Sequence, residues 1–147
     1  MVLRAVSPIG GGLRFGSFGL SATQTTGIAN NNPVLFDTVL AGNLALANAT
    51  VTLPTPGTYR IMAGVSAGFS TPSRAIFSLQ NVTAGTLIGR SALAVAPNFN
   101  VSDTSQPIAN AIITITAVTD IRLLMTDQIS MNVIYSAHTF LEIVQLG

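Results

Sequence analysis

Short apolar segments separated by turn-forming residues make up most of the chain. Thr, Val and Ile dominate these segments, and branched side chains favour the pleated surface of a β-strand. The turn signals recur about every 8–15 residues, which is the spacing expected of a β-sandwich or barrel. No segment has a convincing helical pattern. The expected strands lie at residues 13–20, 34–39, 58–69, 74–82, 86–95, 107–119 and 138–146. Residues 44–53 are expected to form a strand or a ribbon, and residues 121–135 to contain a strand that begins near Arg122.

Alternation of side chains is clearest in the segments 58–69, 107–119 and 138–146. In the last of them, Phe140, Glu142, Val144 and Leu146 alternate with Leu141, Ile143 and Gln145. Several short strands with no helix between them predict an all-β fold built as an antiparallel sandwich. The polar segments 21–33 and 96–106 are expected to be loops, and residues 1–12 a flexible N-terminal arm.

The charge content is unusually low. Only 7% of the residues are charged, against about 25% in ordinary soluble domains, and every basic residue is an Arg. A monomer of this mass exposes roughly 7,000 Å², or about one charge per 650 Å². With a mean hydropathy of +0.58, such a surface must be covered to stay in solution. Since no run approaches the ~18 apolar residues of a membrane-spanning helix, we expect oligomerisation to cover it rather than membrane insertion.

Catalytic, metal and nucleic-acid sites find little support. His138 is the only His and no Ser lies in a nucleophile-type context, so we expect no enzyme and no cofactor. Asp103, Asp120 and Asp127 could ligate calcium, but their isolation favours turn-capping roles. Gly10-Gly11-Gly12 is followed by no Lys-Ser/Thr pair, so it is interpreted as a hinge rather than a phosphate loop. The Arg residues are scattered, and this excludes a basic nucleic-acid patch.

The order of three motifs carries a resemblance. Phe36-Asp37-Thr38-Val39 precedes an apolar ribbon, Pro56-Gly57-Thr58-Tyr59 opens a long strand, and His138-Thr139-Phe140-Leu141 opens the last one. In this order they resemble the tumour-necrosis-factor-like superfamily and its complement-type globular heads. The resemblance covers residues 13–147 and implies one jelly-roll domain of about eight to ten strands that assembles as a homotrimer. It further implies aromatic side chains at the threefold axis, and the matching positions are Phe36, Tyr59 and Phe140.

A second resemblance concerns the source of the chain. Phe15-Gly16-Ser17-Phe18, followed by Ala22-Thr23-Gln24-Thr25-Thr26, is similar to the opening of viral fibre-head and capsid-surface jelly rolls. This implies a bacteriophage or other virion structural protein, assembled in the host cytoplasm and located on the virion surface. The expected function is a capsid decoration or cement protein that binds the major capsid protein or another virion component. The alternative is a receptor- or glycan-binding head of a phage fibre, a spike or a spore-surface glycoprotein.

The N-terminal arm favours the first of these functions. Residues 1–12 have neither the heptads of a coiled coil nor the Gly-X-Y period of a collagen stalk. Val2, Leu3, Val6 and Ile9 could instead insert into a groove or pair with an exposed strand edge of a capsid subunit. Under the alternative, the contact surface would be the loops 21–33 and 96–106.

Overall fold

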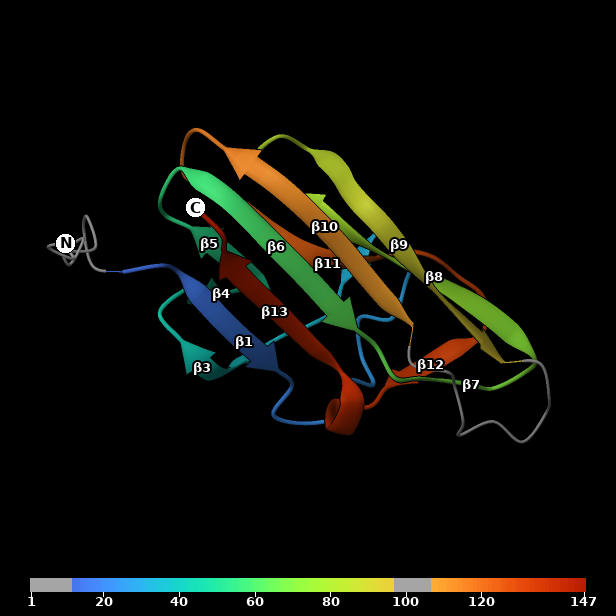
Figure 1. Ribbon diagram of the computed structural model, residues 1–147. Coiled ribbons are helices and arrows are strands. Elements are labelled where there is room, and N and C mark those ends of the chain that lie inside the picture. Colours follow the sequence, from blue (N-terminus) through green and yellow to red (C-terminus); the bar gives the residue numbers. More distant parts are fainter. Residues whose placement is uncertain (1–11, 97–106) are drawn as a thin grey trace, which may run out of the picture.

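A computed structural model describes residues 12–96 and 107–147, which form almost nothing but antiparallel β-strands (Figure 1). Two layers of strands face each other. We call the layer in front in Figure 1 the front sheet and the other the back sheet. The fold class predicted from the sequence, an all-β antiparallel jelly-roll sandwich, is confirmed.

The front sheet has the strand order β3-β1-β13-β6-β10. Its long strands β6, β13 and β10 pair continuously over six to eight residues, and β1 and β3 extend the sheet at one edge. The bounds are Phe15–Gly19 for β1, Thr38–Gly42 for β3, Gly57–Gly64 for β6, Ile108–Ile115 for β10 and Phe140–Gln145 for β13.

The back sheet has the order β9-β8-β11-β5-β4, with the two-residue strand β2 paired to β11. The bounds are Asn32–Pro33 for β2, Ala45–Ala47 for β4, Thr50–Leu53 for β5, Ser73–Asn81 for β8, Thr86–Ala96 for β9 and Thr119–Gln128 for β11. A separate pair, β7 (Ala67–Phe69) and β12 (Met131–Ile134), closes one end of the sandwich.

The two sheets touch edge to edge at a single bridge between Asn110 of β10 and Arg90 of β9. Gly89, just before this bridge, has φ +68° and faces the backbone of Ala111: a Cβ built there would lie 2.7 Å from the Ala111 Cα. Only a glycine combines this left-handed conformation with so close an approach of two strands. The glycine is therefore what lets β9 cross over to β10.

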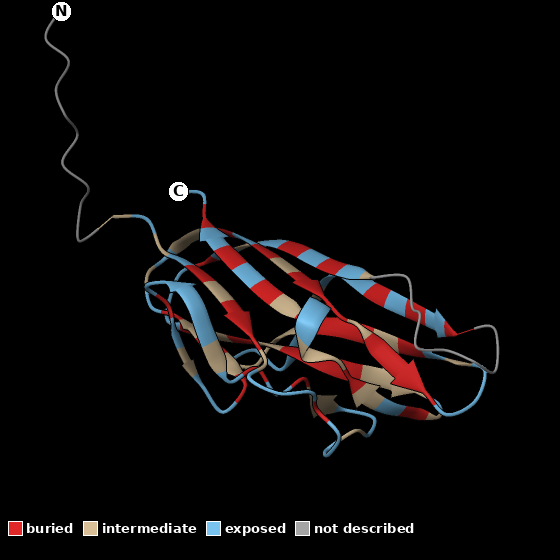
Figure 2. Cartoon of the chain, turned by 90° about the horizontal axis from the view of Figure 1, so that it is seen from below, coloured by how far each residue is buried: buried red, intermediate tan, exposed pale blue. Residues whose placement is uncertain are grey.

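The core lies between the sheets, as the buried inner sides of the strands show (Figure 2). The alternation predicted for residues 58–69 is confirmed up to Ala63, because Tyr59, Ile61 and Ala63 are all fully buried. The predicted strand itself divides into β6, which ends at Gly64, and β7, all three residues of which are buried. On β10 the inward positions are Ala109, Ala111, Ile113 and Ile115, while Ile108 and Ile112 point outward. The small inward side chains fit where β9 approaches β10.

Several predicted boundaries differ from the structure. Within the predicted strand 34–39, residues 34–37 form a connecting loop, and β3 begins only at Thr38. The side chains of Val34 and Phe36 in this loop are buried. The segment 44–53 forms a hairpin, since Asn48 and Ala49 both have positive φ and turn the chain between β4 and β5. Likewise the segment 121–135 divides at Ser130, which has φ +57°.

Helix is confined, within the described residues, to one 3-10 turn, Ser136–His138. No helix in this part of the chain is long and apolar enough to cross a membrane. Residues 1–11 and 97–106 lie outside the described residues, and so does the predicted capsid-binding set Val2, Leu3, Val6 and Ile9.

Candidate functional site

The outward side of the front sheet is the candidate functional surface, and we call it the front face. It consists of the side chains of β1, β13, β6 and β10 that point away from the core. The strand register arranges them in rows across the sheet. One row runs Phe15, Val144, Arg60, Ile112; the next runs Ser17, Glu142, Met62, Asn110; the third runs Phe140, Gly64, Ile108.

Most of this face is apolar and open. The exposed fraction is 69% for Ile112, 47% for Phe15, 45% for Ile108 and 37% for Val144. The Phe140 ring lies flat over Gly64, where a Cβ would come within 2.8 Å of the ring Cζ. Glycine at position 64 therefore keeps the centre of the third row shallow and holds the aromatic ring against the sheet.

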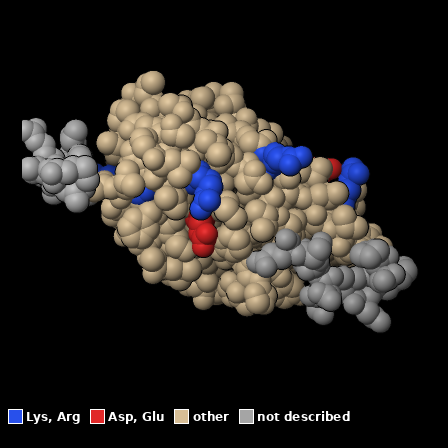
Figure 3. Space-filling model, viewed as in Figure 1, with Lys and Arg blue, Asp and Glu red and all other residues tan. Residues whose placement is uncertain are grey.

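Two charged side chains lie in the middle of the front face. Arg60 on β6 is opposite Val144 and Ile112, while Glu142 on β13 is opposite Met62 and Ser17. The two are diagonal neighbours on adjacent strands, and both are exposed. Figure 3 shows a basic and an acidic group side by side over β6 and β13, with neutral surface around them and further charged groups toward the two ends of this side.

The back sheet presents a different surface, because four of its charged side chains are engaged within the chain. Arg122 Nε donates a hydrogen bond to Gln80 Oε1 (2.7 Å), and Asp120 Oδ1 accepts one from Thr52 Oγ1 (2.7 Å). Arg74 Nη2 and Asp127 Oδ2 form an ion pair at 3.4 Å.

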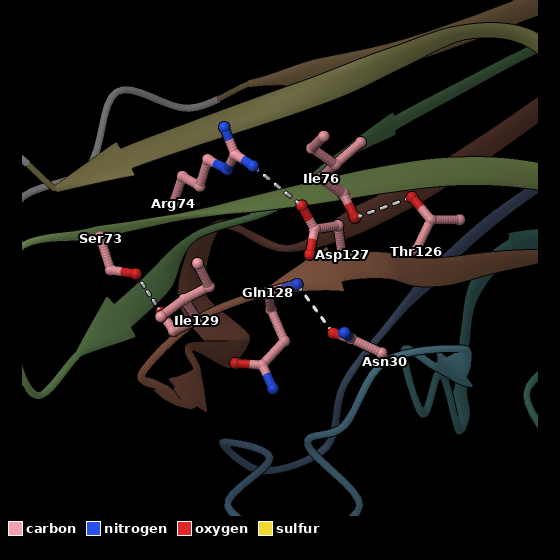
Figure 4. A network of polar contacts seen from close by, with 8 residues as sticks. All are labelled: Asn30, Ser73, Arg74, Ile76, Thr126, Asp127, Gln128 and Ile129. Atoms are coloured by element: carbon pink, nitrogen blue, oxygen red, sulfur yellow. Dashed lines mark hydrogen bonds and ion pairs between the residues drawn. The ribbon is translucent and has the colours of Figure 1, made fainter.

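This ion pair belongs to a polar network at one end of β8 and β11 (Figure 4). In the network, the backbone amide of Gln128 donates to Asn30 Oδ1 (2.8 Å), and Thr126 Oγ1 donates to the Ile76 carbonyl (3.2 Å). Ser73 Oγ also donates to the carbonyl of Ile129. The network ties the loop 21–33 to the back sheet.

The residues predicted for a trimer interface divide between core and surface. Phe36 and Tyr59 are buried within the single chain, with 2% and 0% of their surface exposed. Tyr59 Oη donates a hydrogen bond to the Thr55 carbonyl (2.7 Å). Both side chains therefore belong to the core of one copy and offer no surface to another. Phe140 lies on the front face, half-buried, and stays a candidate.

Other residues singled out in the sequence do not come together. His138 is exposed in the 3-10 turn before β13. Asp120 and Asp127 have the partners given above. Asp103 lies outside the described residues. Within residues 12–96 and 107–147 no three His, Cys, Asp or Glu side chains gather as metal ligands would.

An open hollow of about 550 Å³ lies beside β4, lined by residues 35–37 and 46–49. Its only acid is Asp37. The hydroxyl and the backbone amide of Ser21 donate to this carboxylate at 2.5 and 2.7 Å, and these bonds lower the pKa of Asp37 below its usual 3.8. An exposed carboxylate kept ionised in this way braces the turn after β1 and is a poor proton donor at neutral pH.

Sequence reasoning missed the front face as a surface. The signal was present in the alternation of β13 and β10, but both sides of these strands are apolar. Without the register it was not possible to tell which side faces the core.

Comparison with protein-family models and with curated protein sequences finds no match. Solved structures do match. The globular domain of zebrafish complement 1qA has 13% identity, a TM-score of 0.62, and covers 91% of this chain and 98% of its own. The fold is a jelly roll of the tumour necrosis factor and complement type.

Two further structures agree with this. Eiger TNF from S. frugiperda has a TM-score of 0.70 at 10% identity and covers 92% of this chain and 93% of its own. Murine APRIL has a TM-score of 0.59 at 10% identity, and the match covers 92% of this chain and 100% of that structure. At these identities the likeness extends to the architecture of the jelly roll.

Proposed function

We propose that this jelly roll is a non-enzymatic structural module that works as a homotrimer, with the front face as the contact between copies. The observation that carries the proposal is the row of exposed Phe15, Val144 and Ile112 across one whole sheet. A large exposed apolar surface marks a protein–protein contact, and here Arg60 and Glu142 are the charged groups within it. The low charge of the whole sequence requires such a cover, and the tumour-necrosis-factor-like resemblance favours three copies.

We further propose that the trimer is a decoration protein on the surface of a virus particle. Support comes from the sequence resemblance to viral capsid-surface jelly rolls and from the apolar residues Val2, Leu3, Val6 and Ile9. The segment that precedes β1 joins the sandwich where the backbone amide of Gln145 donates to the Arg14 carbonyl (2.7 Å). The proposed arm would therefore start at one end of the sandwich.

The opposite end of β1 favours a second candidate function, a receptor- or glycan-binding head. The loop 21–33 starts there and is held firmly although much of it is exposed. Buried Gln24 accepts from the Leu35 amide (2.9 Å) and donates to the Thr26 carbonyl (3.1 Å), and Asn32 Nδ2 donates to the Gly27 carbonyl (3.0 Å). A pre-organised exposed loop is suited to recognition.

Deletion of residues 1–9 separates the two functions. The deletion variant is mixed with particles that lack the protein, and its retention after sedimentation is compared with that of the full chain. We expect loss of binding by a variant that light scattering still finds trimeric. Undiminished binding by such a variant would reject the arm as a clamp and favour the receptor-binding head.

A further inference from the structure

We infer that Arg60 of one copy pairs with Glu142 of the next copy, so that the trimer contact is closed by matched charges within an apolar surface. The inference rests on the proposed homotrimer and goes beyond it, because it names the residues that decide which surface the front face accepts.

The position of the two charges is the first argument. The cross-strand neighbours of Arg60 are Val144 and Ile112, and one neighbour of Glu142 is Met62. Any contact that covers the exposed Ile112 and Val144 also removes Arg60 and Glu142 from water. A charge buried without a partner is strongly destabilising, whereas a matched pair is tolerated.

The lack of a partner within the chain is the second argument. On the back sheet Arg74 and Asp127 pair with each other, and Asp120 and Arg122 have polar partners. Arg60 and Glu142 make no hydrogen bond or ion pair with any residue that the structure describes, although they are diagonal neighbours on adjacent strands. Within the described residues, these two charges of the front face are thus left without a partner, and a contact with another copy could supply one.

The signs of the charges select the occupant. A partner that covers this face must supply an anion for Arg60 and a cation for Glu142. A second copy of the front face carries both. In a closed ring each copy offers Arg60 to one neighbour and Glu142 to the other, and rotational symmetry repeats the same pair at every contact. Like charges at the axis are avoided when the two residues alternate around it.

The test is charge reversal with rescue. The variants Arg60→Glu, Glu142→Arg and the double exchange Arg60→Glu/Glu142→Arg are diluted stepwise, and sedimentation velocity gives the concentration at which trimers dissociate. We expect each single variant to raise this concentration on the order of 100-fold. The double exchange should return to within about tenfold of the wild type, because it restores an opposite charge at every contact of the ring.

Arg74→Glu serves as the matched control. It reverses an exposed charge on the back sheet, at an ion pair of the kind that contributes little, and should leave the dissociation unchanged. Circular dichroism checks that all variants keep the β fold, which both exposed positions should tolerate.

The outcomes separate the inference from the proposed function. A monomeric wild type would reject the homotrimer, and the ion pair with it. A trimeric wild type whose single variants dissociate at the wild-type concentration would reject the ion pair alone. Single variants that dissociate but are not rescued by the double exchange would also overturn the pairing, because the charges would then meet other groups.

Discussion

Tyr59 offers the sharpest test of the core, because it is the largest fully buried side chain and also holds a hydrogen bond. We expect Tyr59→Ala to lower the free energy of unfolding by about 3–5 kcal/mol, the usual cost of removing a buried aromatic ring. Tyr59→Phe keeps the ring but leaves the Thr55 carbonyl without its donor. That variant should lose about 1 kcal/mol.

His138→Ala is the control, since this side chain is exposed and a surface change costs within about 0.5 kcal/mol. Thermal unfolding followed by circular dichroism, at one protein concentration for all variants, gives the comparison. At roughly 2–4 °C per kcal/mol for a chain of this size, Tyr59→Ala should melt about 10 °C below the wild type.

The ranking of the three variants decides the outcome. If Tyr59→Ala melts no lower than His138→Ala, then the ring does not fill the core and the packing described above is incorrect. If Tyr59→Phe melts as low as Tyr59→Ala, the hydrogen bond and not the ring dominates at this position.

Two further predictions concern the sheet crossing and the turn after β1. Gly89→Ala should destabilise the fold by about 2 kcal/mol or more, because the residue has positive φ and its new Cβ meets the backbone of Ala111. Gly85→Ala has a similar φ but lies in open space, so it should cost about 1 kcal/mol. Urea unfolding measures both losses of stability, and equal losses would contradict the close approach of β9 and β10. The pKa of Asp37 is lowered by bonds from Ser21, so its stabilising contribution is present above the usual value of 3.8 and is lost as the pH falls through the lower folded value. The melting temperature of Asp37→Asn should therefore be lower than that of the wild type at neutral pH and equal to it at about pH 2. A difference between the two melting temperatures that does not shrink as the pH falls would be inconsistent with this.

The class of the fold could be predicted from the sequence because β-sandwiches place their signal in local alternation. Tyr59, Ile61 and Ala63 share a face in the sequence and are buried together in the structure. The predicted strand boundaries were wrong where the turn has an unusual sequence. Asn48 and Ala49 both adopt positive φ, and an Ala in that conformation gives no sequence signal for a turn.

The interface residues could be predicted only in part, because burial depends on the partner layer and not on residue type. Phe36 and Tyr59 are large aromatics of the kind found at protein contacts, yet both fill the core of one copy. At one place on β10 a small side chain faces inward and a larger one outward: Ala111 is buried where β9 comes close, and Ile112 is exposed. The backbone that approaches Ala111 there is that of Gly89, more than twenty residues away in the sequence.

The mass of the protein in solution tests the central claim most directly. Static light scattering at micromolar concentration is applied to the wild type, to Ile112→Asp on the front face and to Ile129→Asp, an equally apolar exposed position beyond the end of β11. We expect a mass of about 46 kDa, three times the 15.2 kDa of one chain, for the wild type and for Ile129→Asp. Ile112→Asp should fall to the mass of a single folded chain. A wild type of 15.2 kDa, or an Ile112→Asp variant that stays trimeric, would contradict the front face as the contact between copies.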